Sequence, residues 1–484
     1  MKALNQLVIL PVLLLTQLSV FAQSDTKNKI QQVETNLVGS IQIAGEKPAT
    51  IKERMAFYHI KGLSIAVIQN YHIAWAKGYG FADDSLKIPV TDQTLFQSGS
   101  ISKSLNGVGV LKLVQEKKLD LYTDINTYLT SWKFPYDSLS KGKKITVANL
   151  LSHTAGLTVH GFEGYGQRQP LPTIPQVLDG KKPANSPPVR SMYAPGIKSE
   201  YSGGGITISQ LVVMDVTHRP YAEYMKKEVL DPLGMTNSTY TQPPLGFKAG
   251  LLATAYDANG KQVPGKYNIY PEQAAAGLWT TPTDLAKYVI ETQLAYEGKS
   301  AKVLNQATTK LRLTPYLDKT AALGVFTEER DSTGYFQHGG ANTGFRNQYY
   351  GSLKGGNGVV VMVNSDRFDI INEVINSVAK VYDFKGLYNS TVKTMVKVPD
   401  LVMQSYVGKY ALAPTVTITI TYEDGKLKGQ PSGQPKLTLN PESQTKFFLL
   451  EVPVQVEFLK DATGKVNTAI FYENGHKNEA KRIQ

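Results

Sequence analysis

A serine followed three residues later by a lysine is the pattern in this sequence that could carry out covalent chemistry. Seven serines have such a lysine, namely those at 24, 100, 138, 140, 377, 390 and 443. Only Ser100 follows a short apolar run that ends in glycine, and it precedes apolar residues at helical spacing. Residues i and i+3 share a helix face, so Lys103 can lie against the Ser100 hydroxyl and, as a neutral amine, take its proton. The helix start adds N–H groups and partial positive charge near a developing oxyanion.

Composition removes several other chemistries. The chain has no cysteine, which excludes thiolate metal sites, iron–sulfur clusters and a cysteine nucleophile. No Gly-x-Ser-x-Gly motif is present, and none of the seven histidines is followed by glutamate. Without cysteine, nucleophilic catalysis falls to serine, threonine, lysine or a carboxylate, and the context of Ser100 favours serine. We expect no metal and no cofactor.

Two predicted β-hairpins must position these residues. Apolar runs at 63–68 and 73–76 flank Asn70-Tyr71-His72, and runs at 347–353 and 358–363 flank a Gly-rich turn, followed by apolar residues at helical spacing from 370 to 378. The sequence between the hairpins is mostly helical and loop in character. We predict an α+β fold, an α/β sandwich in which one antiparallel sheet from both ends of the domain is flanked by helices and lies beside a helical lobe, with a cleft between them.

Further segments differ in character. Residues 160–190 contain six prolines and four glycines, which predicts a long loop without regular helix or central strand. Residues 385–398 are polar and basic, as in a linker. Beyond them, strict alternation at 416–421 and 452–458 predicts an all-β module, closed into a barrel because open strands would leave edges. The predicted division is 23–384, 385–398 and 399–484.

The N-terminus predicts export. A short positive start precedes an apolar stretch of about 15 residues, and cleavage is expected between Ala22 and Gln23, which makes residues 1–22 a signal peptide. A membrane anchor needs about 20 apolar residues, and no later segment is long and apolar enough. The signal peptide leads us to expect a periplasmic location. The formal net charge of +12 comes from scattered residues, so we expect no nucleic-acid partner.

Several blocks in the same order resemble one known family over about residues 63–382. Its members are the serine β-lactamase and penicillin-binding-protein-like hydrolases, in particular the class C, D-Ala-D-Ala carboxypeptidase and esterase branch. The resemblance rests on Gly62–Val67, Ala76–Gly80, Ser100-Ile101-Ser102-Lys103, Leu150–Leu157, Pro232–Met235 and Ala276–Leu285. It implies Ser100 as nucleophile and Lys103 as its base, whereas His153 in the fourth block is expected to be a packed residue.

The family's second motif, Tyr-x-Asn, aligns with Tyr201-Ser202-Gly203. The resemblance implies that Tyr201 shares the proton relay with Lys103. Glycine replaces the asparagine that would help to hold the acyl-amide of a substrate. This replacement favours substrates other than β-lactams.

The family's third motif, a strand with Lys/His-Thr/Gly-Gly, aligns with His338-Gly339-Gly340. The glycines let a substrate backbone approach the strand edge, and the resemblance implies that the amides of Ala341 and Ser100 form the oxyanion hole. Histidine is mostly neutral at pH 7, which weakens a grip on a substrate carboxylate. Arg346 is the predicted replacement cation.

These observations predict an exported serine hydrolase that acts through an acyl-enzyme on a D-amino-acid peptide, a small ester or a β-lactam. The alternative is a penicillin-binding or cell-wall-peptide-binding protein with little or no turnover. The C-terminal module resembles the lipocalin-like β-domain of some family members, where it covers the site or mediates assembly. The sequence does not determine its role here, nor the oligomeric state.

Overall fold

The computed structural model describes residues 24–248, 250–452, 454–473 and 475–483, so the predicted signal peptide at 1–22 lies outside the described residues. The described chain forms two compact units. The first contains residues 52–371 and 378–387 with the segment up to residue 31, and the second contains residues 32–51, 372–377 and 388–484. The boundaries at 384 and 399 stay predictions.

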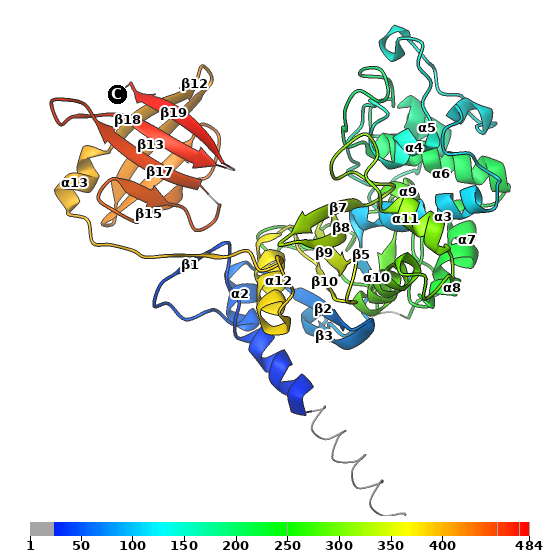
Figure 1. The fold of residues 1–484 in the computed structure, drawn as a ribbon, viewed down its shortest axis with the longest axis horizontal. Helices are drawn as coiled ribbons and strands as arrows, with labels where there is room; N and C mark the ends of the chain where they lie inside the picture. Colours follow the sequence, from blue (N-terminus) through cyan, green and yellow to red (C-terminus); the bar gives the residue numbers. More distant parts are fainter. Residues whose placement is uncertain (1–23, 249, 453, 474, 484) are drawn as a thin grey trace, which may run out of the picture. The chain divides into compact units, whose positions relative to one another are not determined.

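The first unit is built on a seven-stranded antiparallel sheet in the order β4-β3-β2-β10-β9-β8-β7 (Figure 1). Its strands are β2 (Gly62–Gln69), β3 (His72–Asp83), β4 (Ile88–Pro89), β7 (Phe326–Arg330), β8 (Thr333–Asn342), β9 (Phe345–Ser352) and β10 (Gly358–Val363). Strand β2 pairs with β10, with Val67 opposite Val359. The prediction that both hairpins join one sheet is therefore confirmed.

Turn residues fix the register of both hairpins. Asn70 and Tyr71 have φ values of 52° and 63°, and Gly355 and Gly356 have φ values of 81° and 66°. Positive φ at both central residues gives a turn whose twist matches the right-handed twist of the strands. Asn70 and Tyr71 alone connect β2 to β3, whereas the longer segment 353–357, with Gly355 and Gly356 at its centre, connects β9 to β10.

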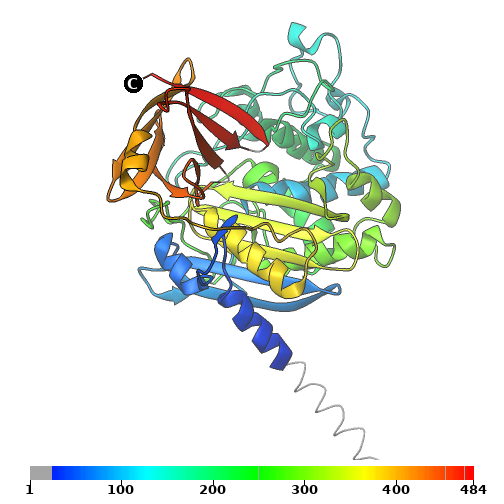
Figure 2. The same ribbon diagram turned by 60° about the vertical axis from the view of Figure 1, so that its left-hand side comes forward.

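Helices cover both faces of the sheet (Figure 2). On one face, Trp75 of β3 donates a hydrogen bond of 2.8 Å to the Tyr382 hydroxyl of α12 (Asp369–Tyr382). On the other, Val289 of α10 (Pro282–Tyr296) packs against Gly351 and Gly358. None of the described helices is both long and apolar enough to cross a bilayer.

The helical lobe lies between β3 and β7 in the sequence. The helices are α3 (Ser102–Gln115), α4 (Val147–Leu151), α5 (Ile174–Asp179), α6 (Gly203–Thr217), α7 (Tyr221–Met225), α8 (Asp231–Leu233), α9 (Gln273–Ala276) and α11 (Gln306–Arg312). The central helix of the lobe is α3, which packs against α6, α9 and α11. Residues 24–34 and α2 (Ile51–Phe57) are also helical, and the short strands β5 (Phe96–Gln97) and β6 (Trp279–Thr280) pair with each other.

The prediction for residues 160–190 is wrong in one respect, because the loop contains helix α5. Thr173 caps this helix through a hydrogen bond with Gln176, and Pro175 stands in its first turn. Proline is tolerated there because the first helical N–H groups have no partner within the helix. Gly180, with φ of 63°, ends the helix after six residues.

The second unit contains a closed eight-stranded barrel, which confirms the predicted all-β module. Its strands are β12 (Gly408–Ala413), β13 (Val416–Glu423), β14 (Lys426–Pro431), β15 (Leu437–Pro441), β16 (Lys446–Phe448), β17 (Val454–Lys460), β18 (Val466–Glu473) and β19 (His476–Arg482). Strand β12 pairs with β19 and closes the barrel. Helix α13 (Asp400–Ser405) precedes it, and β1 (Ile41–Ile43) pairs with β11 (Thr391–Lys393).

Candidate active site

Ser100 and Lys103 are in direct contact. Ser100 lies in a 3-10 turn, Gly99–Ile101, that leads into α3. The Lys103 Nζ donates to the Ser100 Oγ at 2.9 Å and to the carbonyl oxygen of Ala275 at 2.7 Å. Lys103 is only 2% exposed and takes part in none of the ion pairs of the described residues. The amine is therefore held against the hydroxyl without a neighbouring carboxylate.

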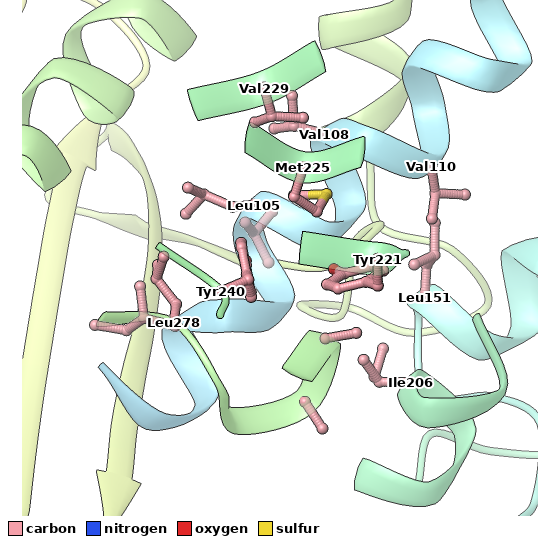
Figure 3. Packing of buried hydrophobic residues seen from close by; sticks show 14 of the residues in the cluster. Leu105, Val108, Val110, Leu151, Ile206, Tyr221, Met225, Val229, Tyr240 and Leu278 are labelled. Carbon is pink, nitrogen blue, oxygen red and sulfur yellow. The ribbon is translucent and has the colours of Figure 1, made fainter. Parts of the chain in front are cut away.

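Packing around α3 fixes the position of Lys103. The predicted helix is present, and its apolar residues Leu105, Val108 and Leu111 are buried; most of its other residues are buried as well, so the helix is enclosed on nearly every side. Figure 3 shows Leu105 and Val108 of α3 among side chains from α7, the segment at 229 and the segments near Tyr240 and Leu278. Its polar residues form internal hydrogen bonds, such as that from the Asn106 amide to the Ser209 hydroxyl at 2.9 Å. A helix fixed in this way gives Lys103 little freedom.

Two glycines let β8 approach the Ser100 turn. Gly99 has φ of 54°, and a Cβ atom added there would lie 2.6 Å from the amide nitrogen of Ala341. A Cβ atom added at Gly340 would lie 1.9 Å from the carbonyl oxygen of Ser98. Both distances are far too short for any side chain. The amide of Ala341 is thereby brought beside the turn that carries Ser100, which is the arrangement that an oxyanion hole requires.

Tyr201 lies beside Lys103. It precedes Ser202, whose hydroxyl accepts a hydrogen bond from Gly205 and caps α6. The centre of the Tyr201 ring is 5.0 Å from the Lys103 Nζ and 4.4 Å from the centre of the His153 ring. The structure thus brings the second predicted motif to the amine of the first.

His338 of β8 is buried, with 3% of its surface exposed. Its Nδ1 lies 2.6 Å from the carbonyl oxygen of Gly339, which requires a proton on Nδ1. Burial lowers the pKa of His338 to about 3, and the Lys103 amine adds to the lowering. His338 is therefore neutral at physiological pH and supplies no cation.

Arg346 does not join this group, so the predicted role of Arg346 as a carboxylate-binding cation is not supported. Gly340 pairs with Asn347, whose amide donates to the Gln97 carbonyl beside the Ser100 turn. Successive strand residues face opposite sides of a sheet, so Arg346 projects from the other side. There it pairs with Asp366 at 2.8 Å and donates to the carbonyl oxygen of Asn342 at 2.7 Å.

The sequence analysis assigned no role to several residues of the site. Phe326, the first residue of β7, stacks against Tyr201 and His153, and the carbonyl oxygen of Ala275 binds Lys103. The fourth block of the resemblance contained His153, and burial lowers the pKa of this histidine well below its usual value. No sequence motif marks Phe326, whereas Ala275 directly precedes the resembling block at 276–285.

Glu272 is a second residue that the sequence analysis missed. It caps α9, the helix that contains Ala275, and none of its surface is exposed. Neither carboxylate oxygen meets a hydrogen-bond partner in another described residue. Burial raises the pKa of Glu272 to about 7.

Within the described part of the chain, no three histidine, aspartate or glutamate side chains gather closely enough to hold a metal ion.

Comparisons with known proteins give family models and relatives that match parts of this chain. The family model described as Beta-lactamase matches residues 48–374, and a model described as a domain of unknown function (DUF3471) matches residues 393–482. Protein flp of Staphylococcus aureus (strain MRSA252) is 25% identical over 319 residues, which cover 63% of this chain and 60% of that protein. The match thus spans about three fifths of the length of this relative.

Solved structures share the fold. The octameric penicillin-binding protein homologue from Pyrococcus abyssi has a TM-score of 0.62 at 20% identity, covering 89% of this chain and 98% of the other. D-amino acid amidase from Ochrobactrum anthropi SV3 has a TM-score of 0.58 at 20% identity, covering 74% and 99%. At this identity the likeness concerns the fold alone.

Proposed function

Because this chain belongs to the beta-lactamase family, we propose that it is a serine hydrolase that forms an acyl-enzyme on Ser100. The observation that carries the proposal is the hydrogen bond of 2.9 Å from the Lys103 Nζ to the Ser100 Oγ. A buried amine without a carboxylate partner can act as a general base toward the hydroxyl that it touches. Among the described residues, none of the other six serines with a lysine three residues later has a buried lysine amine that donates a hydrogen bond to the serine hydroxyl.

The proposed cycle has two halves. The Ser100 Oγ attacks the carbonyl carbon of the substrate while its proton passes to Lys103, and the oxygen of the tetrahedral intermediate is held by the amides of Ser100 and Ala341. Lys103 and Tyr201 return the proton to the leaving group as the scissile bond breaks. Water then attacks the ester on Ser100 and releases the acid.

The proposed substrates contain an amide or ester bond and are a D-amino-acid peptide or amide, a small ester or a β-lactam. The fold likeness to D-amino acid amidase supports amide substrates. Gly203 and His338 favour amides and esters over β-lactams, because the asparagine amide and the lysine ammonium of the family's motifs are both absent. A comparison of nitrocefin, p-nitrophenyl acetate and D-amino-acid p-nitroanilides tests this preference, and faster turnover of nitrocefin than of the other two contradicts it.

Covalent labelling tests the nucleophile. We expect Ser100→Ala to abolish labelling by a fluorophosphonate or a fluorescent penicillin, because the variant lacks the hydroxyl that the buried amine of Lys103 contacts. The matched control is Ser138→Ala, since Ser138 also has a lysine three residues later but is exposed. Ser138→Ala should keep full labelling. Labelling that persists in Ser100→Ala removes Ser100 from the proposed role.

One observation favours a second function, a cell-wall-peptide-binding protein with little turnover. Position 203 is a buried glycine at the start of α6, where the family motif has asparagine. A site without this amide holds the acyl group of a substrate less firmly. A burst of one product equivalent with no further turnover would support this function, and steady turnover would contradict it.

We also propose that the protein is exported to the periplasm. The support is the apolar N-terminal segment with its expected cleavage site after Ala22. N-terminal sequencing of protein recovered from the periplasmic fraction should begin at Gln23. Protein that retains Met1 and stays in the cytoplasm would contradict this proposal.

A further inference from the structure

Four rings pack together next to Lys103, and we call them the ring cluster: His153, Tyr201, Phe326 and His338. The ring centres are 4.4 Å apart for His153 and Tyr201, 5.3 Å for Phe326 and His338, and 6.3 Å for Tyr201 and His338. Three separate parts of the chain supply these rings: the turn after α4, the segment before α6, and strands β7 and β8. The cluster forms one wall of the site around Ser100.

Neither histidine of the ring cluster carries a formal charge at neutral pH. His338 uses its Nδ1 proton on the carbonyl oxygen of Gly339, and its Nε2 is a buried acceptor with no hydrogen-bond partner among the described residues. His153 accepts a hydrogen bond of 3.2 Å from the Ser202 amide through Nδ1. Burial lowers the pKa of both histidines. His338 thus places a neutral, acceptor-type ring where lysine, the other residue that the family's third motif allows, would place a cation.

The neighbouring cations are already engaged. Arg346 projects from the other side of the sheet and pairs with Asp366 at 2.8 Å. The Lys103 amine binds the Ser100 hydroxyl and the Ala275 carbonyl. Lys198, three residues before Tyr201, has a side chain that is 58% exposed and pairs with Glu200 at 2.8 Å. None of these three is free to neutralise a carboxylate beside the scissile bond.

From this arrangement we infer that the site selects acyl substrates with an uncharged leaving group and discriminates against a carboxylate next to the scissile bond. The inference rests on the proposed function and specifies its substrate class, namely amides and esters with neutral leaving groups. Its physical basis is desolvation. A carboxylate that binds against the ring cluster loses water and meets two neutral histidines instead of a cation, which raises the free energy of its bound state.

Two other sources of positive charge lie nearby in the fold. Arg312 is close enough to lower the pKa of His338, but it is buried and its guanidinium donates to the Ser104 carbonyl oxygen at 2.9 Å and to the Tyr288 hydroxyl at 2.6 Å. The other source is on the surface. An open groove with a volume of about 740 Å³ is lined by residues 197–199 and 317–320. Its Lys319 belongs to none of the ion pairs of the described residues. A carboxylate that reached this lysine would be favoured instead of rejected, so the experiment must include a variant at this position.

The experiment uses two thioesters that differ in a single group. Both carry an N-benzoyl-D-alanyl acyl group, and the leaving group is thioglycolate in one and its carboxamide, thioglycolamide, in the other. Attack by Ser100 breaks the acyl–sulfur bond, the thiol leaves with a proton, and water later releases N-benzoyl-D-alanine. Thiol release, followed with a chromogenic disulfide, gives kcat/KM for the purified full-length protein. We expect the carboxamide to be preferred by about tenfold or more.

Substitutions at His338 separate charge from shape. His338→Lys adds a cation beside the site and should reduce the preference for the carboxamide by about tenfold, whereas the neutral His338→Gln should keep the wild-type ratio. If His338→Lys does not fold, the ratios of the wild-type protein and His338→Gln still test the inference.

Equal kcat/KM values for the two thioesters, or a preference for the carboxylate, would overturn the inference. If Lys319→Gln then abolishes a preference for the carboxylate, the groove lysine is the cation and the inference is equally overturned. Failure of the proposed function gives a different result. In that case the wild-type protein hydrolyses neither thioester nor p-nitrophenyl acetate, and no fluorophosphonate label is found on Ser100.

Discussion

Glu272 shows how a single residue can make stability depend on pH. Its carboxyl group is fully buried, and burial raises its pKa to about 7 from an ordinary value of 4.5. Between these values the folded protein keeps a proton that the unfolded chain has lost. Stability therefore falls as pH rises through this window and stays lower above it.

We predict that Glu272→Gln removes this pH dependence. A pKa difference of about 2.5 units corresponds to about 3 kcal/mol of unfolding free energy that the wild-type protein loses between pH 4.5 and 7. Glutamine does not titrate, so the free energy of unfolding of the variant, relative to that of the wild-type protein, should rise by up to this amount between pH 4.5 and 7. Urea unfolding at pH 4.5 and pH 8 measures the difference. Parallel pH curves for the two proteins would show that Glu272 is ionised in the folded state.

The types and spacing of the residues predicted the nucleophile and its base, but not the position of Arg346. Ser100 and Lys103 were predicted from spacing and context, and the structure shows them in contact. Arg346 was chosen because its charge and position in the sequence suited a carboxylate, but strand alternation directs it to the other side of the sheet. Such an error is understandable, because a sequence shows which charges are present and not which partners they find.

At the scale of elements, the site depends on the close approach of β8 to the Ser100 turn. Gly339 and Gly340 are adjacent, yet an added Cβ atom meets different neighbours at each. At Gly340 it would lie 1.9 Å from the backbone oxygen of Ser98, and at Gly339 it would lie 2.8 Å from the end of the Gln348 side chain. A backbone atom of a buried turn cannot move aside easily, whereas a side-chain amide can rotate.

We therefore predict that Gly340→Ala destabilises the first unit by about 1–3 kcal/mol, the usual cost of overpacking. Gly339→Ala is the matched control for the unfolding measurement and should cost clearly less. Urea unfolding followed by tryptophan fluorescence gives both values, since Trp75, Trp132 and Trp279 all lie in the first unit. Equal losses in the two variants would mean that the Ser98 turn adapts to the added methyl group.

Also at the scale of elements, the pattern of apolar residues in α3 did not indicate how much of the helix is buried. The residues of α3 include apolar positions at helical spacing, but Ser102, Ser104 and Asn106 are buried as well. Their hydrogen bonds join α3 to distant segments, for example Ser104 to the Tyr349 hydroxyl of β9 and Asn106 to the Ser209 hydroxyl of α6, which a pattern of apolar residues cannot indicate. Proline density likewise obscured α5, because Pro175 occupies the one part of a helix where proline is tolerated.

At the scale of the whole molecule, the two units have separate cores. The barrel interior is filled by aromatic side chains, with the Tyr406 and Phe458 rings stacked at 4.3 Å and Phe447 edge-on to both at 5.7 Å. All three rings are buried. The resemblance to lipocalin-like domains thus concerns the barrel and not an internal ligand site at these residues.

We predict that Phe458→Ala lowers the stability of the barrel alone. Removing a buried phenylalanine costs about 3–5 kcal/mol, so calorimetry should show one unfolding transition at lower temperature and a second one unchanged. Fluorophosphonate labelling of Ser100 after heating follows the first unit independently. Loss of labelling at the same lowered temperature would show that the two units unfold together.

The sequence by itself determined the nucleophile motif, the two hairpins, the antiparallel sheet and the all-β module, because local spacing and turn residues encode these features. Only the tertiary structure decided which charges stay free. It buried His338 as a neutral ring, paired Arg346 with Asp366, and placed Phe326 and the Ala275 carbonyl beside the reacting groups. The physical reason is that burial, strand facing and hydrogen-bond partners depend on contacts between residues far apart in the chain.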